Sequence, residues 1–249
     1  MAYNQIVKLR NSHRDIQGNI IGDTDTLISK LVRIKALAFD WDGVFNNGDK
    51  GHVPSTFNEI DSMGINMLRF GYYLLNKANP YAFIVTGERN ETALRWSERE
   101  HFHAVYLKAK NKLDVLHQLE KQFDISREEI LFVFDDIHDL SLAMECGVKI
   151  LVPNLGAEKF AGFCQKMNYC DYITKNSGGQ HALREISETV LSLLGLFEKT
   201  VKLRIDFEGI YFDYWQTRNR VGTQILELSY GEDGKSSPKI LKDESDPQH

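Results

Sequence analysis

Four groups of polar residues each follow a short apolar run of the chain. They are Asp40-Trp41-Asp42-Gly43-Val44, Thr86-Gly87, Asn111-Lys112 and Asp135-Asp136-Ile137-His138-Asp139. Carboxylates can supply a nucleophile, a general acid and base, and ligands for Mg²⁺, whereas Thr and Lys bind phosphate oxygens. If the four groups converge, they contain what phosphoryl transfer through an aspartyl phosphate requires.

The acidic residues allow two interpretations. Asp40 and Asp42 would both emerge at the carboxyl edge of a sheet, where open α/β proteins bind ligands, although an Asx-type turn would need only one of them. Asp135, Asp136 and Asp139 crowd together, which is unfavourable unless a cation lies among them, and an oxygen-rich site suits Mg²⁺. An acidic loop with one helix cap would explain Asp139 alone.

Thr86 and Lys112 are candidate phosphate-binding residues. Thr86 and the amides after it, including that of Gly87, could hold a phosphate oxygen at a helix N-terminus, or Thr86 could merely cap a helix over 88–100. Asn111 has the character of an N-cap, which places Lys112 in the first helical turn, where the macrodipole disfavours a cation. An anionic partner would remove that conflict, whereas Lys108 is expected to be solvated.

Elements that would position these residues follow from the hydrophobic pattern. Strands are predicted at Ile34–Phe39, Tyr81–Val85, Ala104–Tyr106, Leu131–Phe134, Val148–Val152 and Tyr172–Thr174, and helices at Thr24–Arg33, Lys112–Phe123, Leu140–Cys146 and Ala182–Leu194. We expect Asp139 to cap the helix that starts at Leu140 and Gly147 to end it in the left-handed conformation. Alternating strands and helices predict a doubly wound α/β fold with a mainly parallel sheet.

The ends of the chain differ from this core. The predicted division is a helical extension over 1–33, a core over 34–195, a C-terminal extension over 196–230 and a disordered tail over 231–249. Within the extension, Val201–Trp215 alternates apolar and polar residues, which favours β structure. The insert Phe45–Phe57 has the size of a small β-hairpin and is too short for a cap domain.

Composition excludes several classes of protein. The chain has 249 residues, 42% hydrophobic and 26% charged, with a net charge of −5. This is enough for a sizeable core, and the mild acidity argues against a nucleic-acid binder. The apolar runs are too short to span a membrane. Three cysteines are too few for a disulfide framework or a four-ligand zinc site, and the N-terminal residues lack the apolar core of a secretory signal, which favours a cytoplasmic protein.

The order of the four motifs resembles that of the haloacid dehalogenase (HAD) superfamily of phosphatases. More narrowly, the chain is similar to 3-deoxy-D-manno-octulosonate 8-phosphate (KDO 8-phosphate) phosphatases and to related nonulosonate 9-phosphate phosphatases. The segments that carry this narrower similarity are Asp40–Gly48, Phe57–Ile65, Cys170–Thr174 and Gly178–Glu185. The resemblance covers about residues 34–195. It implies a Rossmann-like core without a large cap domain, and a homotetramer in which a neighbouring subunit closes the site.

The resemblance also implies roles for individual residues. They are Asp40 as nucleophile, Asp42 as general acid and base, Asp40, Asp135 and the Asp42 carbonyl as Mg²⁺ ligands, Asp136 and Asp139 as supports, Thr86, Gly87 and Lys112 as phosphate-binding residues, and Arg184 as a contact to the substrate of the neighbouring subunit. The implied activity is a Mg²⁺-dependent phosphomonoester hydrolase for an acidic sugar phosphate similar to KDO 8-phosphate.

Phe134 stands where the family has glycine, and a ring there could narrow the active-site floor or tilt the metal loop. Two alternatives therefore remain open at this stage. One is a catalytically altered homologue that acts as a binding or regulatory protein. The other is a phosphatase for a nonulosonate 9-phosphate. His101 and His103 are expected to serve packing or the surface, and Trp41 is expected to pack under the loop that holds the paired acids.

Overall fold

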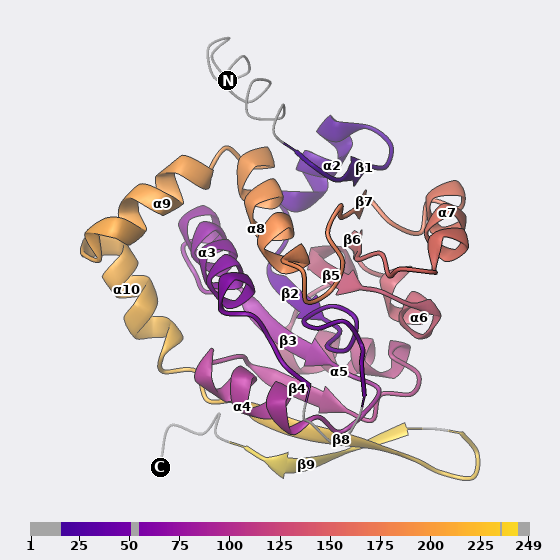
Figure 1. The fold of residues 1–249 in the computed structure, drawn as a ribbon. Coiled ribbons are helices and arrows are strands. Elements are labelled where there is room, and N and C mark those ends of the chain that lie inside the picture. Colours follow the sequence, from indigo (N-terminus) through magenta and orange to yellow (C-terminus); the bar gives the residue numbers. More distant parts are fainter. Residues whose placement is uncertain (1–15, 51–54, 235, 244–249) are drawn as a thin grey trace.

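The computed structural model describes residues 16–50, 55–234 and 236–243. In this part of the chain the strands form one nine-stranded sheet of order β1-β7-β6-β5-β2-β3-β4-β8-β9 (Figure 1). Every pair from β7 across to β8 is parallel, and the outermost pair at each edge is antiparallel. The predicted α/β fold with a mainly parallel sheet is confirmed.

The six strands predicted within residues 34–195 are present, with small shifts at their ends. The strands are β1 (Asn19–Ile20), β2 (Ala36–Phe39), β3 (Tyr81–Val85), β4 (Ala104–Leu107), β5 (Ile130–Phe134), β6 (Val148–Leu151), β7 (Tyr172–Ile173), β8 (Gln224–Tyr230) and β9 (Ser236–Lys242). All residues of β2, β4 and β5 are buried, because helices cover both faces of the sheet. This is why these strands are continuous apolar runs in the sequence.

The helices form layers on both sides of the sheet. They are α2 (Thr24–Leu31), α3 (Glu59–Asn76), α4 (Glu91–Arg99), α5 (Leu113–Phe123), α6 (Leu140–Ala143), α7 (Glu158–Lys166), α8 (Ala182–Leu193), α9 (Phe197–Asp206) and α10 (Gly209–Arg218). Apolar residues of α2, α3, α4 and α8 pack in one core cluster, and those of α5, α6 and α7 in another. Helices α9 and α10 pack outside α3 and add an outer layer there (Figure 1). No helix within the described residues is long and apolar enough to cross a membrane.

Local sequence explains where the helices near the site begin. Asn58 caps α3 by accepting from the backbone N–H of Ile60, and Asn90 caps α4 by accepting from Thr92 and Ala93. The interpretation that Thr86 caps a helix over 88–100 is therefore wrong. Ser126 and Glu129 form a capping box at a short 3₁₀ turn, Arg127–Glu129.

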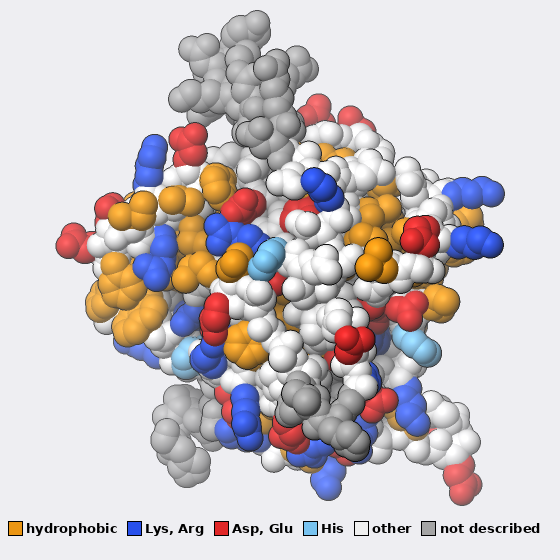
Figure 2. Space-filling model, in the orientation of Figure 1, with side chains coloured by type: hydrophobic (Ala, Val, Ile, Leu, Met, Phe, Trp, Pro, Cys, Tyr) orange, Lys and Arg blue, Asp and Glu red, His pale blue; other side chains and the backbone are white. Residues whose placement is uncertain are grey.

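The C-terminal extension differs from the prediction. Val201–Trp215 was expected to be β structure, but it lies in α9 and α10. Tyr211, Tyr214 and Arg218 are buried at helical spacing, so their contact with the core, rather than the alternation of polarity, sets the local structure. Exposed apolar side chains gather over α9 and α10 in Figure 2, among them Ile205, which is 74% exposed.

Three further predictions need correction. A disordered tail over 231–249 is wrong for residues 236–242, which form β9 on the edge of the sheet, while 244–249 lie outside the described residues, as do 1–15. The described parts of the Phe45–Phe57 insert contain turns and irregular chain rather than strands. Gly147 does not have a positive φ. A Cβ there would lie 2.0 Å from the Glu128 carbonyl oxygen, so close packing, not a left-handed turn, requires glycine.

Candidate active site

The carboxyl edge of the sheet brings three acidic side chains together. Asp40 follows β2, Asp135 follows β5, and Asp139 ends the short 3₁₀ helix Ile137–Asp139. All three are buried, and one ligand atom from each lies within 4.8 Å of the others. We call Asp40, Asp135 and Asp139 the carboxylate triad. In the described part of the chain, this is the one cluster with the composition of a metal site.

Lys112 neutralises part of this negative charge. Its ammonium lies 2.6 Å from Asp40 Oδ1, also pairs with Asp139, and its side chain is 3% exposed. Lys112 occupies the N-cap position of α5, whereas the sequence predicted Asn111 there and Lys112 in the first turn. The anionic partner that the sequence required for a lysine at this helix end is therefore the carboxylate triad.

Burial controls the protonation of the site. It raises the pKa of Asp40 to about 6, although the charge of Lys112 acts in the opposite direction. Burial, with the charges of Asp40 and Asp139, raises the pKa of Asp135 to about 9. Burial lowers the pKa of Lys112, but the two neighbouring carboxylates outweigh this effect, and its pKa is raised overall. One lysine for three buried carboxylates fits a site that also takes a divalent cation bound through oxygen.

Two glycines let the surrounding loops approach the triad. Gly43 has a φ of +82°, and a Cβ there would lie 1.9 Å from Asp135 Oδ2. A Cβ on Gly178 would lie 2.1 Å from the Gly43 carbonyl oxygen. Glu185 on α8 holds the loop before Gly178 by accepting from the backbone N–H groups of Lys175 and Asn176. The glycine-rich segment near residue 178 therefore packs directly on the loop of the paired acids.

Asp42 lies in a different environment from the triad. Its side chain is 17% exposed, and its carboxylate lies 3.2 Å from Lys50 Nζ and 3.5 Å from Asn46 Nδ2. A carboxylate with access to solvent beside a buried one is a suitable arrangement for proton exchange with water.

The loops after β3 and β4 lie against each other. Thr86 is buried, its hydroxyl accepts from the backbone N–H of Glu88, and its carbonyl accepts from Ala109 at 3.0 Å. A Cβ on Gly87 would have no atom within 4 Å, so the space beside this residue is open. Thr86 and Gly87 thus line an accessible position at the same sheet edge as Lys112.

The second acidic motif is divided between two environments. Asp136 is exposed and accepts from the backbone N–H of Ile137 at 2.7 Å. Asp139 is buried and accepts from the N–H groups of Asp135 and Asp136. Asp139 stands at the predicted N-cap position of the helix from Leu140, but its carboxylate makes no capping hydrogen bond there and holds the preceding loop instead. Asp136 caps the 3₁₀ turn and lies outside the triad.

Sequence reasoning missed Asn154. Its Nδ2 donates to Asp135 Oδ2 at 2.6 Å from the loop after β6. Asn154 could have been found from the sequence, because it is a polar residue shortly after the strand predicted at Val148–Val152. The other site residues were selected because they follow predicted strands in the same way.

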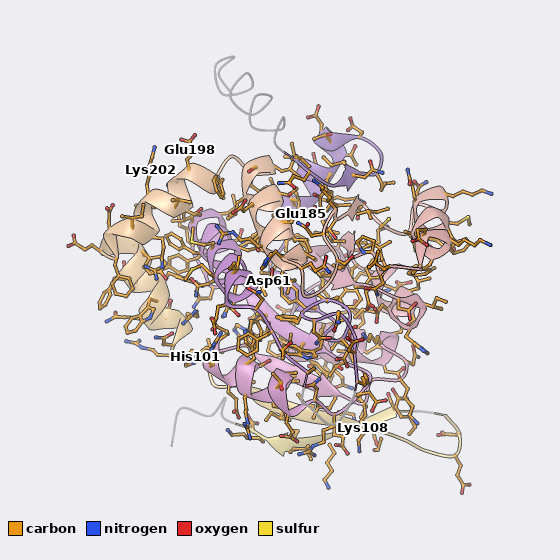
Figure 3. The ribbon with its side chains drawn as sticks, in the orientation of Figure 1. Asp61, His101, Lys108, Glu185, Glu198 and Lys202 are labelled. Carbon is orange, nitrogen blue, oxygen red and sulfur yellow. The ribbon has the colours of Figure 1, made fainter. Side chains whose placement is uncertain are left out.

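Arg184 makes contacts within its own chain. Its backbone N–H donates to Asp61 Oδ1 at 2.8 Å, and its Nε donates to Glu188 at 2.5 Å. Figure 3 shows Asp61 on α3 and Glu185 on α8, the two helices that Arg184 joins. A small polar pocket beside it includes His181 and Asn176. The role of Arg184 toward a neighbouring subunit stays a prediction.

Phe134 does not enter the site. Its ring is fully buried, stacks on Phe132 with centroids 6.0 Å apart, and belongs to the core cluster on the side of α5 and α6. Asp135, the next residue, joins the carboxylate triad despite this ring. Trp41 packs as expected, stacked on Phe45, and His103 accepts a hydrogen bond from the backbone of Ala82.

The sequence and the fold of this chain are similar to those of known phosphatases. The chain is 24% identical over 172 residues to the 3-deoxy-D-manno-octulosonate 8-phosphate phosphatase KdsC of Yersinia pestis, covering 67% of this chain and 84% of that protein. The KDO 8-phosphate phosphatase of Moraxella catarrhalis, solved with magnesium, phosphate and KDO, superposes with a TM-score of 0.61 at 26% identity, covering 73% of this chain and 99% of that one. A probable YrbI family phosphatase from Pseudomonas syringae gives 0.61 and 26%, with coverage of 74% and 99%. No protein-family model matches the chain.

At this low identity, the chain has the HAD-type α/β fold and resembles the KdsC phosphatases among the proteins that share it. The resemblance and the buried triad together support a phosphatase that uses Mg²⁺.

Proposed function

We propose that the protein is a Mg²⁺-dependent phosphomonoesterase that acts on an acidic sugar phosphate of the KDO 8-phosphate type, through a phosphorylated Asp40. The observation that carries this proposal is the carboxylate triad with Lys112 inserted into it. A phosphate dianion near three carboxylates is repelled unless cations offset the charge. Lys112 supplies one such cation, and bound Mg²⁺ would supply the other and polarise the phosphoryl group.

The reaction has two halves. Asp40 attacks phosphorus, so that a bond forms between its carboxylate oxygen and phosphorus while the bond to the sugar oxygen breaks. Asp42 donates a proton to that leaving oxygen. Asp42 then accepts a proton from the water that attacks the phosphorylated Asp40, which releases inorganic phosphate and regenerates the carboxylate.

The remaining residues bind and orient. Lys112 and Thr86 hold phosphate oxygens, and the Gly87 region leaves the open position that the phosphate enters. Asp40, Asp135 and the backbone carbonyl of Asp42 would hold Mg²⁺, and Asp139 supports them by fixing the loop of Asp135.

Finer properties belong to the same proposal. The acid recognised is KDO 8-phosphate or a nonulosonate 9-phosphate, the enzyme is a cytoplasmic homotetramer, and Arg184 contacts the substrate carboxylate of a neighbouring subunit. The KdsC relatives are named for KDO 8-phosphate, which favours that substrate. Gel filtration with light scattering tests the assembly directly.

Phosphate release tests the activity. The purified chain with Mg²⁺ is offered KDO 8-phosphate, nonulosonate 9-phosphates and neutral sugar phosphates, with EDTA as the metal control. Asp40→Asn should abolish release, whereas Glu198→Gln, an exposed carboxylate on α9 (Figure 3), should not change it. A folded protein that binds Mg²⁺ but hydrolyses none of these substrates would favour a binding role instead.

A further inference from the structure

The loop between β4 and α5, Lys108–Asn111, delivers Lys112 to the carboxylate triad. It is tightly bent, because Lys108 has a φ of +55° and its carbonyl accepts from the N–H of Lys110 at 2.9 Å. A left-handed conformation is unfavourable for a residue with a Cβ, so contacts outside the loop must hold it. The position of Lys112 depends on those contacts.

Strand β8 supplies one contact at the start of this loop. It pairs in parallel with β4 (Figure 1). Glu227 lies in register with Leu107, the residue before Lys108. Glu227 Oε1 lies 2.9 Å from Lys108 Nζ, and its other oxygen lies 3.7 Å from an Arg89 nitrogen. Arg89 belongs to the loop after Thr86. One carboxylate therefore connects the two loops that carry Thr86 and Lys112.

The same strand holds the end of the loop. The Tyr230 hydroxyl oxygen accepts from the backbone N–H of Asn111 at 3.1 Å. Asn111 directly precedes Lys112. The ammonium of Lys110 lies 6.0 Å from the centre of the Tyr230 ring. Both ends of Lys108–Asn111 are thus tied to β8, and Lys108 can be followed beside that strand in Figure 3.

We propose that Glu227 and Tyr230, two residues of β8, are positioning residues for phosphate binding and set the separation of the Thr86 and Lys112 loops. This inference rests on the proposed phosphatase function. It also assigns a role to a segment outside residues 34–195, the range over which the sequence resembles KDO 8-phosphate phosphatases.

Positioning can be separated from stability here. Lys108 and Arg89 are about half exposed, and ion pairs in such surroundings contribute little to folding. A small displacement of a group that holds a transferring phosphoryl group, in contrast, lowers the rate strongly. Loss of the β8 contacts should therefore change kinetics and phosphate binding while the melting temperature stays the same.

The test uses the full chain with Mg²⁺ and begins with the single variants Glu227→Gln, Tyr230→Phe and Ser229→Ala. Ser229 is the matched control, because it lies on β8 but its hydroxyl faces Ser237 of β9. In Glu227→Gln and Tyr230→Phe we expect kcat to fall about tenfold and the inhibition constant of inorganic phosphate to rise about tenfold. Both quantities should be unchanged in Ser229→Ala. Lys108→Met should lower kcat as much as Glu227→Gln does. The double variant Lys108→Met/Glu227→Gln should lower kcat no further than either single variant.

Each other result contradicts the inference. If kcat and phosphate inhibition in Glu227→Gln and Tyr230→Phe stay within about twofold of the wild type, β8 does not position the loops. If their melting temperatures fall well below that of Ser229→Ala, the role of β8 is structural only. A wild type without turnover would contradict the proposed function. In that case the rise in melting temperature that inorganic phosphate causes in the wild type and in the variants still tests the role of β8. If phosphate does not stabilise the wild type, both the proposed function and this inference are overturned.

Discussion

Lys112 and Lys108 stand close together in the sequence, and each contacts carboxylates, but their surroundings differ. Lys112 is 3% exposed between Asp40 and Asp139, whereas Lys108 is 47% exposed beside Glu227. We call the region of Lys112, Asp40 and Asp139 the buried edge of the sheet. We call the region of Lys108 and Glu227, where β8 joins the core, the rim.

This difference separates two uses of the same chemistry. A buried charge has lost its hydration, so removal of its partner leaves an uncompensated charge in a medium of low polarity. An exposed pair keeps most of its hydration and is screened by salt, so it adds little stability. The buried edge is therefore expected to govern stability and metal binding together, and the rim to govern geometry.

The largest expected effect is that of Lys112→Met, which is compared with Lys108→Met. Lys112→Met should lower the free energy of unfolding of the metal-free protein by about 3–5 kcal/mol and reduce kcat by about 10³-fold or more. Lys108→Met should lower the free energy of unfolding by about 1 kcal/mol at most. Denaturant unfolding measures both. Equal losses of stability would break the distinction between the two regions.

Next in size is the substitution of two glycines with similar backbone conformations. Gly43 and Gly156 have φ values of +82° and +87°, but only a Cβ on Gly43 would meet another atom, Asp135 Oδ2. Gly156→Ala should cost about 1–2 kcal/mol from backbone strain alone. Gly43→Ala should cost about 1–3 kcal/mol more and also weaken Mg²⁺ binding. Unfolding curves with and without Mg²⁺ distinguish them, and similar losses would show that the contact with Asp135 is unimportant.

The sequence predicted the buried edge better than the rim. Asp40, Thr86 and Asp135 each follow a fully apolar strand, so the rule that ligands bind beyond the carboxyl ends of parallel strands places them correctly. The environment of Asp139 could not be read in the same way, because its hydrogen bonds to the loop of Asp135 depend on tertiary contacts. Asn154 also follows a predicted strand and could have been selected by the same rule, but its contact with Asp135 from a separate loop depends on tertiary packing.

The C-terminal extension shows what a polarity pattern leaves out. Leu203, Ile205 and Phe207 alternate with charged residues, but Ile205 is 74% exposed and Phe207 ends α9 in the left-handed conformation. The apolar and polar residues that alternate in this segment therefore do not alternate between buried and exposed positions. Strand β9 is mostly exposed and forms by pairing with β8, so its own composition gave no sign of it.

The pH dependence tests the buried edge on a smaller scale. An unperturbed aspartate loses its proton near pH 3.8, whereas Asp135 in the folded protein keeps one up to about pH 9. Between these values the folded protein holds more protons, so the stability of the metal-free protein should fall as pH rises through this window and level off above it. Mg²⁺ must displace the proton, and its affinity should rise by at most about tenfold per pH unit. Thermal-shift titrations across the window measure this, and Asp135→Asn should remove the part of the trend above about pH 6, where Asp40 no longer contributes.

The smallest expected effect concerns Asn154. Its amide donates to the Asp135 oxygen that Gly43 faces and so directs that carboxylate. Asn154→Ala should raise the Mg²⁺ concentration for half-maximal thermal stabilisation by about tenfold. Asn79→Ala is the control, since its amide donates only to Thr217 at the surface. An unchanged Mg²⁺ requirement would mean that the triad alone fixes Asp135.

The central claim is that Asp40 carries the phosphoryl group. Asp42→Asn should slow the hydrolysis of the phosphorylated enzyme, because its proton acceptor is removed. Rapid quenching of this variant with Mg²⁺ and p-nitrophenyl phosphate, whose leaving group needs no proton from Asp42, followed by peptide mass spectrometry, should place one phosphoryl group on Asp40, and Asp40→Asn should carry none. Release of phosphate by the wild type with no label on Asp40, or with the label on another residue, would contradict the account.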